Sequence, residues 1–168
     1  HQNYSLRNIG NMDETPMFFN MVGNKAVNKV GEKEICVKSI GHEKKHFTVV
    51  LACLADGTTL KPMVITLMKT FLSKEKFPPG IIVHVQERGW IDDEGCLKWI
   101  NDIWSKRTSG LLKKRLLLVR DKFKSHLVER VRKRMQQNNT DIAVIPGGLT
   151  SIFQPLDVSL NKPFKDRI

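Results

Sequence analysis

The sequence predicts a mixed α/β domain, in which helices cover the faces of a sheet, from three observations. The first half of the chain is rich in strand patterns, and the second half alternates strand, helix, strand and helix. Residues 116–119 are four consecutive apolar residues between charged ones, which is typical of a strand buried on both faces. No GxGxxG or Walker A motif occurs, so the pattern does not indicate a dinucleotide-binding fold.

The first half contains several predicted strands. Residues 7–14 predict a short strand that ends in an acidic pair, because Pro16 disfavours helix before it. Residues 24–40 alternate weakly and predict a polar hairpin at a sheet edge. Residues 46–54 form the strongest strand pattern, and residues 60–67 predict its antiparallel partner. Asp56, followed by glycine, is interpreted as a turn former and not as a catalytic group.

Another short strand is predicted at residues 81–85, followed by a helix that begins after an acidic run. Asp92, Asp93 and Glu94 resemble a metal cluster on paper, but helix capping is the favoured interpretation. The apolar stripe of this helix is predicted to face the core, with both tryptophans serving as core residues and not as base-stacking platforms. The stripe comprises Cys96, Leu97, Trp99, Ile100, Ile103 and Trp104.

After residue 121 the pattern predicts helix, strand and helix. Ser125 is the expected cap of a helix whose inward side carries Leu127, Val128, Val131 and Met135. Residues 141–145 predict the next strand, and residues 149–156 an irregular loop. Asp157 follows Pro155 at the expected start of a last helix, where the helix dipole favours a carboxylate.

Composition bounds the class of protein. The 168 residues are 40% hydrophobic, enough for one domain with its own core, and no run of about 18 apolar residues indicates a membrane span. Cys36, Cys53 and Cys96 are widely spaced, which predicts reduced thiols in an intracellular setting. Because His1 is preceded by no methionine and the last residues continue a charged segment, we expect a fragment truncated at both ends.

The charge is basic and clustered. The net charge is +11 and the isoelectric point is near 9.8. Residues 105–134 contain twelve lysines and arginines, with Asp121 and Glu129 as the acidic residues. Such a run is often a solvated face, but together with the high isoelectric point it favours binding of a polyanion. Nucleic acid is favoured over a membrane surface, because no basic segment has the apolar face of an interfacial helix.

Asp121 follows the apolar run 116–119 at the place where open α/β sheets bind their ligands. For a single aspartate there, a turn or cap role is the favoured interpretation. Asp13 and Asp157 occur in comparable settings at strand and helix ends. Three carboxylates that converge would favour a catalytic role.

Several motifs together resemble the DDE endonuclease domain of pogo/Tigger transposases, in the Tc1/mariner superfamily, with centromere protein B and jerky-like proteins as domesticated relatives. They are residues 11–16 (NMDETP), 41–52 (GHEKKHFTVVLA), 118–121 (LVRD), 125–126 (SH), 145–151 (IPGGLTS) and 154–157 (QPLD). The resemblance covers nearly all of the chain. It implies one RNase H-like domain over residues 1–168, with a mixed five-stranded sheet and helices on both faces. No helix-turn-helix DNA-binding domain is expected before it.

The resemblance also implies the chemistry. Matched motif by motif, the catalytic and metal-binding acids are Asp13, Asp121 and Asp157, with 35 residues between the last two. Two Mg²⁺ or Mn²⁺ ions held by carboxylates can stabilise both the attacking and the leaving oxygen of a phosphodiester. The expected partners are transposon-end and target DNA in the nucleus, with no membrane, and the resemblance leaves a homodimer open. DNA-backbone contacts are predicted for Lys113, Lys114, Arg115, Arg120, Lys122, Lys124, Arg130, Arg132, Lys133 and Arg134.

One departure from the family pattern keeps a second hypothesis open. Arg120 and Lys122 flank Asp121, where the family has an aromatic or apolar residue before the acid. Either cation could pair with the carboxylate and compete with a metal ion. The alternative is therefore a domesticated, inactive relative that binds nucleic acid in chromatin or transcription. An unrelated basic binding module is the third hypothesis.

Overall fold

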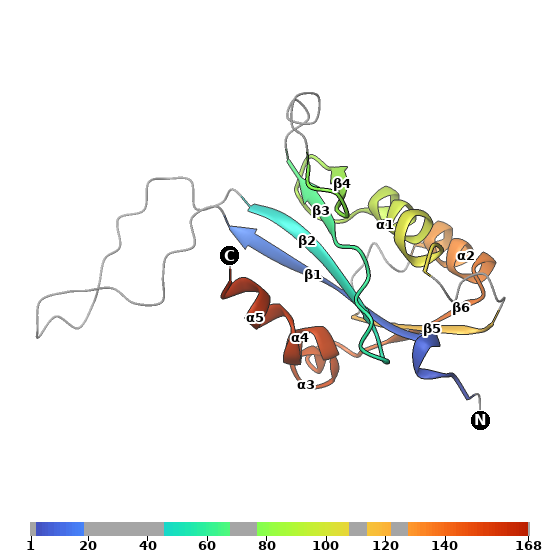
Figure 1. The fold of residues 1–168 in the computed structure, drawn as a ribbon. Coiled ribbons are helices and arrows are strands. Elements are labelled where there is room, and N and C mark those ends of the chain that lie inside the picture. Colours follow the sequence, from blue (N-terminus) through green and yellow to red (C-terminus); the bar gives the residue numbers. More distant parts are fainter. Residues whose placement is uncertain (1–2, 19–45, 68–76, 108–113, 122–127, 168) are drawn as a thin grey trace, which may run out of the picture.

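The computed structural model of the chain describes residues 3–18, 46–67, 77–107, 114–121 and 128–167 (Figure 1). Its elements are, in order, η1 (Leu6–Asn8), β1 (Ile9–Phe18), β2 (His46–Leu54), β3 (Met63–Thr66), β4 (Ile82–Val85), α1 (Asp93–Trp99), the π-helical η3 (Ile100–Trp104), β5 (Leu116–Arg120), α2 (Glu129–Gln137), β6 (Thr140–Val144), α3 (Thr150–Phe153), α4 (Pro155–Ser159) and α5 (Asn161–Lys165). The hairpin predicted at residues 24–40 lies outside the described residues, as does Cys36. No helix of the described residues is long and apolar enough to cross a membrane.

The strands form one mixed sheet in the order β4-β3-β2-β1-β5-β6 (Figure 1). β2 pairs antiparallel with β1 and β3, whereas β5 pairs in parallel with β1 and β6. The predicted α/β class is confirmed. The predicted number of five strands is wrong for the described chain, because β4 pairs in parallel with β3 and adds a sixth strand at the edge.

The main core lies between the sheet and the helices α1, η3 and α2. Trp99 and Trp104 are 1% and 0% exposed, and their rings stack with centroids 5.7 Å apart. Trp104 Nε1 donates a hydrogen bond of 2.9 Å to Thr140 Oγ1, which satisfies the buried indole N–H. The predicted core role of both tryptophans is confirmed. Gly10 in β1 makes room for Trp104, since a Cβ at this position would lie 2.6 Å from the indole ring.

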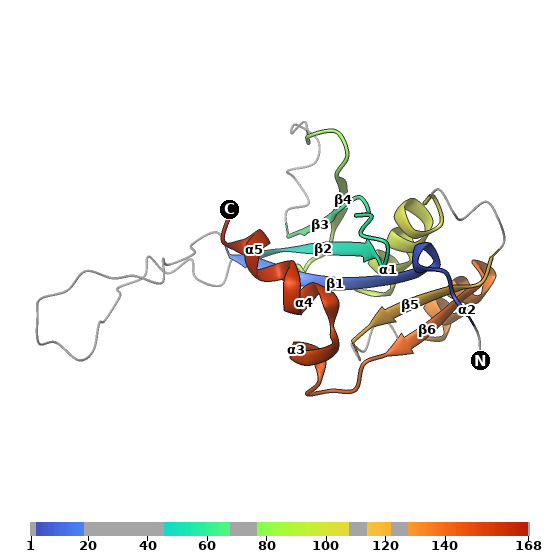
Figure 2. The same ribbon diagram turned by 60° about the horizontal axis from the view of Figure 1, so that its bottom comes forward.

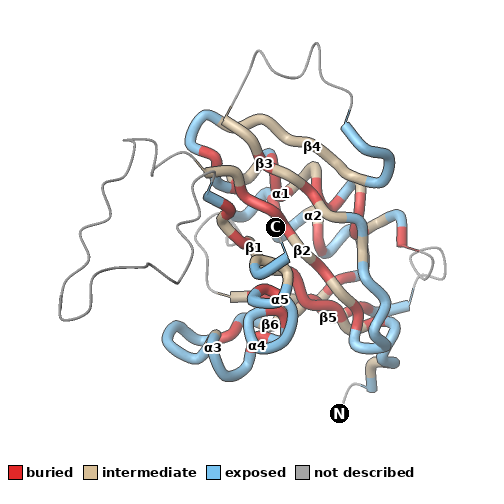
Figure 3. Tube along the Cα trace, turned by 60° about the vertical axis from the view of Figure 1, so that its left-hand side comes forward, coloured by how far each residue is buried: buried red, intermediate tan, exposed pale blue. Residues whose placement is uncertain are grey.

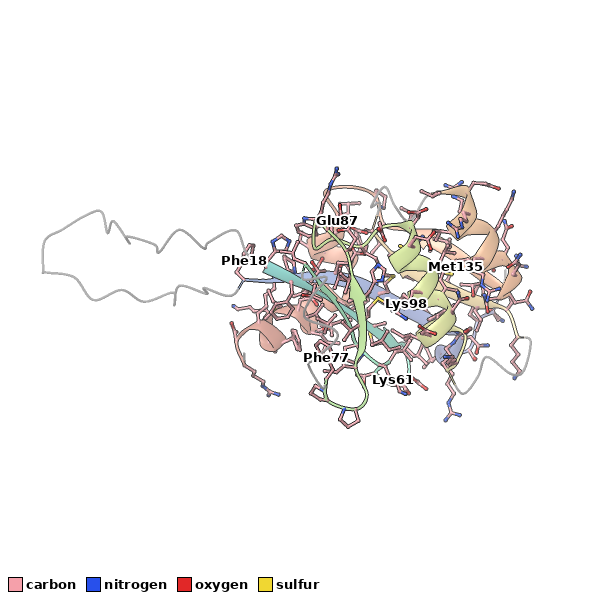
Figure 4. The ribbon with its side chains drawn as sticks, turned by 90° about the horizontal axis from the view of Figure 1, so that it is seen from above. Phe18, Lys61, Phe77, Glu87, Lys98 and Met135 are labelled. Atoms are coloured by element: carbon pink, nitrogen blue, oxygen red, sulfur yellow. The ribbon has the colours of Figure 1, made fainter. Side chains whose placement is uncertain are left out.

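Helices α1 and α2 lie side by side on this face, as the positions of Lys98 and Met135 indicate in Figure 4. Asp92 Oδ1 accepts a hydrogen bond of 2.8 Å from Gly95 N, so the predicted N-cap is confirmed. In α2 the predicted inward positions Val131 and Met135 are buried. Val128 is 41% exposed and precedes the helix, so its predicted inward position is wrong. The predicted cap Ser125 lies outside the described residues.

Strand β1 is longer than predicted, because Pro16 does not end it. The strand runs to Phe18 and pairs with β2 along its whole length. β1 pairs with β5 over residues 9–11 in the described chain, so at Pro16 one edge of β1 needs no backbone donor. As a result Asp13 lies within a strand and not at its end.

The second face of the sheet carries α4, which contacts β1 and β2, with α3 and α5 on either side of it (Figure 2). Leu156 of α4 is 1% exposed, whereas Ile152, Phe153 and Val158 are more than 60% exposed. Figure 3 shows this difference as buried stretches in the strands and exposed outer turns of α3 and α4. Leu156 is thus the buried apolar contact of α4 with the sheet, and Phe164 of α5 is half-buried.

Candidate functional site

Two of the three predicted acids meet on the second face of the sheet, although they lie at opposite ends of the sequence. Asn161 Nδ2 donates a hydrogen bond of 2.5 Å to Asp13 Oδ2 and one of 2.8 Å to Asp157 Oδ1. Asn161 is 6% exposed. A single amide group thus bridges the carboxylates of β1 and α4.

Local structure explains why these side chains face each other. Side chains alternate along a strand, so Met12 joins the core under α1 while Asp13 points to the opposite face. Pro155 is the first residue of α4, which places Asp157 in its first turn as predicted. Asn161 follows Asp157 by four residues, the spacing at which side chains of consecutive helical turns lie on one side.

The carboxyl of Asp13 is a strongly perturbed acid. Burial raises its pKa, and the nearby carboxylate of Asp157 raises it further, to about 7. The hydrogen bond from Asn161 acts in the opposite direction, because it stabilises the ionised form. Full ionisation of Asp13 at neutral pH therefore requires additional positive charge beside it.

Asp121 lies directly after β5 and is not part of this cluster. The register of the two strands pairs Asn11 with Val119. Side chains alternate between the faces of a strand, so Asp121, two residues after Val119, follows β5 on the side of the sheet that carries Asn11 and Asp13. Within the described residues, no three His, Cys, Asp or Glu side chains come close enough to hold one metal ion. The structure thus joins Asp13 and Asp157 and leaves Asp121 as a neighbour.

Asn11 is a buried residue of the site that the sequence analysis did not identify. Its side chain is 4% exposed, and Nδ2 donates a hydrogen bond of 3.0 Å to the Val119 carbonyl. Its Oδ1 accepts one of 3.1 Å from Leu156 N. Asparagine is uncommon in strands, so Asn11 two residues before Asp13 was a usable signal. The spacing of Asn161 from Asp157 was a second one.

The structure corrects one of the predicted DNA contacts, Arg120, and gives the positions of several others. Arg120 is 1% exposed, and burial lowers the pKa of its guanidinium; it is a core residue and not a surface contact. Lys114 and Arg115 precede β5, at the strand end opposite Asp121, and Arg115 binds Asp141 at 2.6 Å. Lys113, Lys122 and Lys124 lie outside the described residues.

The four basic residues predicted on α2 are Arg130, Arg132, Lys133 and Arg134, and this helix covers the face away from Asp13 and Asp157. Arg130 pairs with Glu94 of α1, and Lys133 with Glu129 at 3.6 Å. The cations on the segment that carries Asn161 are instead Lys162, Lys165 and Arg167. The sequence analysis did not name these three residues, because the basic run at 105–134 is denser.

Comparison with known proteins identifies relatives over the whole chain. A family model described as DDE superfamily endonuclease matches residues 44–168. The human protein "Pogo transposable element with KRAB domain" is 37% identical over 165 residues, which is 98% of this chain and 27% of that protein. "CENP-B homolog protein 2" of Schizosaccharomyces pombe is 27% identical over 174 residues, 96% of this chain and 32% of that protein. The chain spans about a quarter to a third of the length of these relatives.

Solved structures share the fold. The "Mos1 transposase paired-end complex with left transposon end" matches with a TM-score of 0.63 at 12% identity, over 96% of this chain and 42% of that chain. The "Mos1 mariner paired end complex with Mn" matches with a TM-score of 0.52 at 14% identity, over 82% of this chain and 36% of that chain. The likeness confirms the expected RNase H-like architecture of the sheet and helices.

Proposed function

This chain belongs to the DDE superfamily endonucleases, in the pogo group of the Tc1/mariner transposases, and we propose that it is a metal-dependent catalytic domain that cleaves and transfers DNA strands. The proposed catalytic and metal-binding residues are Asp13, Asp121 and Asp157. The observation that carries the proposal is the contact of Asp13 and Asp157 through Asn161. The half-buried carboxylate of Asp13 and the exposed one of Asp157 repel each other when both are ionised, and a bound cation would remove this cost.

The side chains present fit Mg²⁺ or Mn²⁺. All candidate ligand atoms are oxygens, the hard donors that these ions prefer. Asn161 Oδ1 is buried and has no hydrogen-bond partner among the described residues, and rotation of this amide by half a turn would present the oxygen to a cation between the two carboxylates. A mariner complex of the same fold is described as containing Mn, which agrees with this choice. When bound, the ions would activate the attacking oxygen and stabilise the leaving oxygen.

The residues of the chain have distinct roles in this proposal. Asp13 and Asp157 would hold the cation from β1 and α4, and Asp121, directly after β5, would be the third ligand. Asn161 holds the first two carboxylates together before the ion arrives, because its amide group is a neutral donor to both. Because the pKa of Asp13 is about 7, this carboxyl is partly protonated at neutral pH, and a cation bound beside it would favour the ionised form.

DNA is the proposed substrate, and the net charge of +11 and the transposon-end complexes of the same fold support it. Lys162 is exposed and follows Asn161. It is the proposed phosphate contact on the face of the sheet that carries Asp13 and Asp157. The nucleus is the proposed location, since the proposed substrate is DNA. A homodimer is proposed because the related complexes are paired-end assemblies.

Nicking of supercoiled plasmid in the presence of Mn²⁺ tests the activity, together with calorimetric titration of Mn²⁺. Asp157→Asn removes one proposed ligand, and we expect loss of nicking and at least a tenfold weaker Mn²⁺ affinity. Asp93→Asn, in the first turn of α1 on the other face, is the matched control and should leave both unchanged. Equal Mn²⁺ affinity of the protein and Asp157→Asn would overturn the assignment.

A second function is supported by the separation of Asp121 from the Asp13 and Asp157 pair. A domesticated relative would retain the fold and bind DNA without cutting it, with the acidic pair kept as a structural contact. The same assay separates the two proposals. DNA binding without nicking in Mg²⁺ or Mn²⁺ selects the second.

A further inference from the structure

Asn11 lies on one of the three segments that carry the acids and forms hydrogen bonds with the other two. It lies two residues before Asp13 in β1. Its Nδ2 binds the carbonyl of Val119, two residues before Asp121, at 3.0 Å. Its Oδ1 binds the amide of Leu156, one residue before Asp157, at 3.1 Å.

We propose that Asn11 is the positioning residue of the metal site, which sets the three carboxylates relative to one another without touching substrate or metal. The inference rests on the proposed function, because it assumes that the three acids act together. It goes beyond that function, since Asn11 carries no charge and supplies no ligand.

The contact with α4 replaces a missing helix cap. The first amide groups of a helix have no partner within the helix. The N-cap residue of α4, Gln154, makes no side-chain hydrogen bond to them, and Pro155 has no N–H to donate. Asn11 Oδ1 accepts from the next amide, Leu156, and so performs from β1 the role that a cap residue normally has. The position of Asp157 is thereby fixed to β1.

The contact with β5 lies at the last position where the two strands pair. β1 and β5 pair over residues 9–11, and Asp13 and Asp121 lie beyond the last pair. The bond from Asn11 to Val119 therefore closes the ladder just before the two acids, where backbone pairing in the described chain ends.

An amide is the group that this place requires. One atom must accept from Leu156 and the other must donate to Val119, within a side chain that is 4% exposed. Leucine has nearly the same shape and forms neither bond, and aspartate forms the first and not the second. These two substitutions therefore separate general packing from positioning.

The test combines a metal-free measurement with a metal titration. In metal-free Asn11→Leu, we expect faster hydrogen exchange of the Leu156 amide and shifted NMR signals of the Asn161 side-chain amide, which reports on Asp13 and Asp157. Mn²⁺ affinity should fall about 10–100-fold, the range for residues that orient metal ligands. Unchanged Leu156 exchange and Asn161 signals overturn the inference, whatever the metal does.

Thr140→Val is the matched control. Thr140 also makes two hydrogen bonds, with Trp104 and with the Asn138 carbonyl, but on the other face of the sheet. It should leave Leu156 exchange, the Asn161 signals and Mn²⁺ affinity as in the unmodified protein. If Thr140→Val and Asn11→Leu changed Leu156 exchange, the Asn161 signals and Mn²⁺ affinity equally, Asn11 would contribute only to packing, and the inference would be overturned.

Two outcomes separate this inference from the proposed function. If the unmodified protein binds no Mn²⁺, the proposed function fails, and the metal-free signals alone decide whether Asn11 positions the acids. If Asn11→Leu does not fold, Asn11→Asp takes its place. We then expect Leu156 to stay protected and the Asn161 signals to stay near their original positions, because the acceptor is kept. Rapid exchange of Leu156 in folded Asn11→Asp would overturn the proposed role.

Discussion

Asp13 and Asp157 accept hydrogen bonds from the same nitrogen, Asn161 Nδ2, at 2.5 and 2.8 Å. One neutral amide thus stands between two acids that would otherwise repel each other. Burial and the nearby carboxylate of Asp157 raise the pKa of Asp13, and the hydrogen bond from Asn161 offsets part of this rise.

The first prediction concerns stability and pH without metal. The pKa of Asp13 is about 7 in the folded chain and near its ordinary value in the unfolded chain. As the pH rises, Asp13 therefore loses its proton in the unfolded chain before it does so in the folded chain. The contribution of Asp13 to the free energy of unfolding therefore decreases from about pH 4 to about pH 7 and is constant above. Urea denaturation at pH 5 and pH 8 measures it, and Asp13→Asn should remove this part of the pH dependence. A pH dependence identical in the two proteins would contradict the prediction.

The second prediction concerns Asn161. Asn161→Leu removes both bridging hydrogen bonds, so we expect the pKa of Asp13 to rise further above 7. A ¹³C NMR titration of the Asp13 carboxyl measures the change. Asn101→Leu removes an exposed asparagine of η3, on the opposite face of the sheet. It is the control and should leave the pKa of Asp13 unchanged. A lower pKa in Asn161→Leu would show that the bridge does not stabilise the ionised acid.

The third prediction concerns which face binds DNA. Lys162→Gln removes an exposed charge beside Asn161, and we expect weaker DNA binding. The slope of log affinity against log salt concentration should become shallower by the amount that corresponds to about one phosphate contact. Lys133→Gln removes a charge on α2, where Lys133 pairs with Glu129, and should have a smaller effect. Fluorescence anisotropy at several salt concentrations measures both. A larger effect of Lys133→Gln would indicate that DNA binds the face of the sheet that α1 and α2 cover.

The fourth prediction concerns the contact between β1 and η3. Gly10→Ala places a methyl group 2.6 Å from the buried ring of Trp104, and we expect a loss of about 1–3 kcal/mol of stability from overpacking. Gly147→Ala, where a Cβ meets no atom within 4 Å, is the control and should be nearly neutral. Thermal unfolding measures both, and equal melting temperatures of Gly10→Ala and the unmodified protein would show that the ring moves freely.

Local patterns predicted many elements correctly. The turn at Asp56 is confirmed, since its Oδ1 accepts from Thr58 N at 3.0 Å, and so is the cap at Asp92. The buried stripe of α1 and η3 and the helical start before Asp157 also agree with the sequence. Each of these features is fixed by residues within a few positions of one another.

The sequence by itself thus determined the mixed α/β class, the family and the three candidate acids, because periodicity, turn chemistry and motifs are local. Tertiary structure alone decided that β1 continues past Pro16, that Arg120 is buried, and that Asn161 joins Asp13 to Asp157. The physical reason is that these features depend on strand pairing and on contacts between residues more than a hundred positions apart. No local preference encodes such contacts, so they exist only once the sheet has formed and the helices have packed on its two faces.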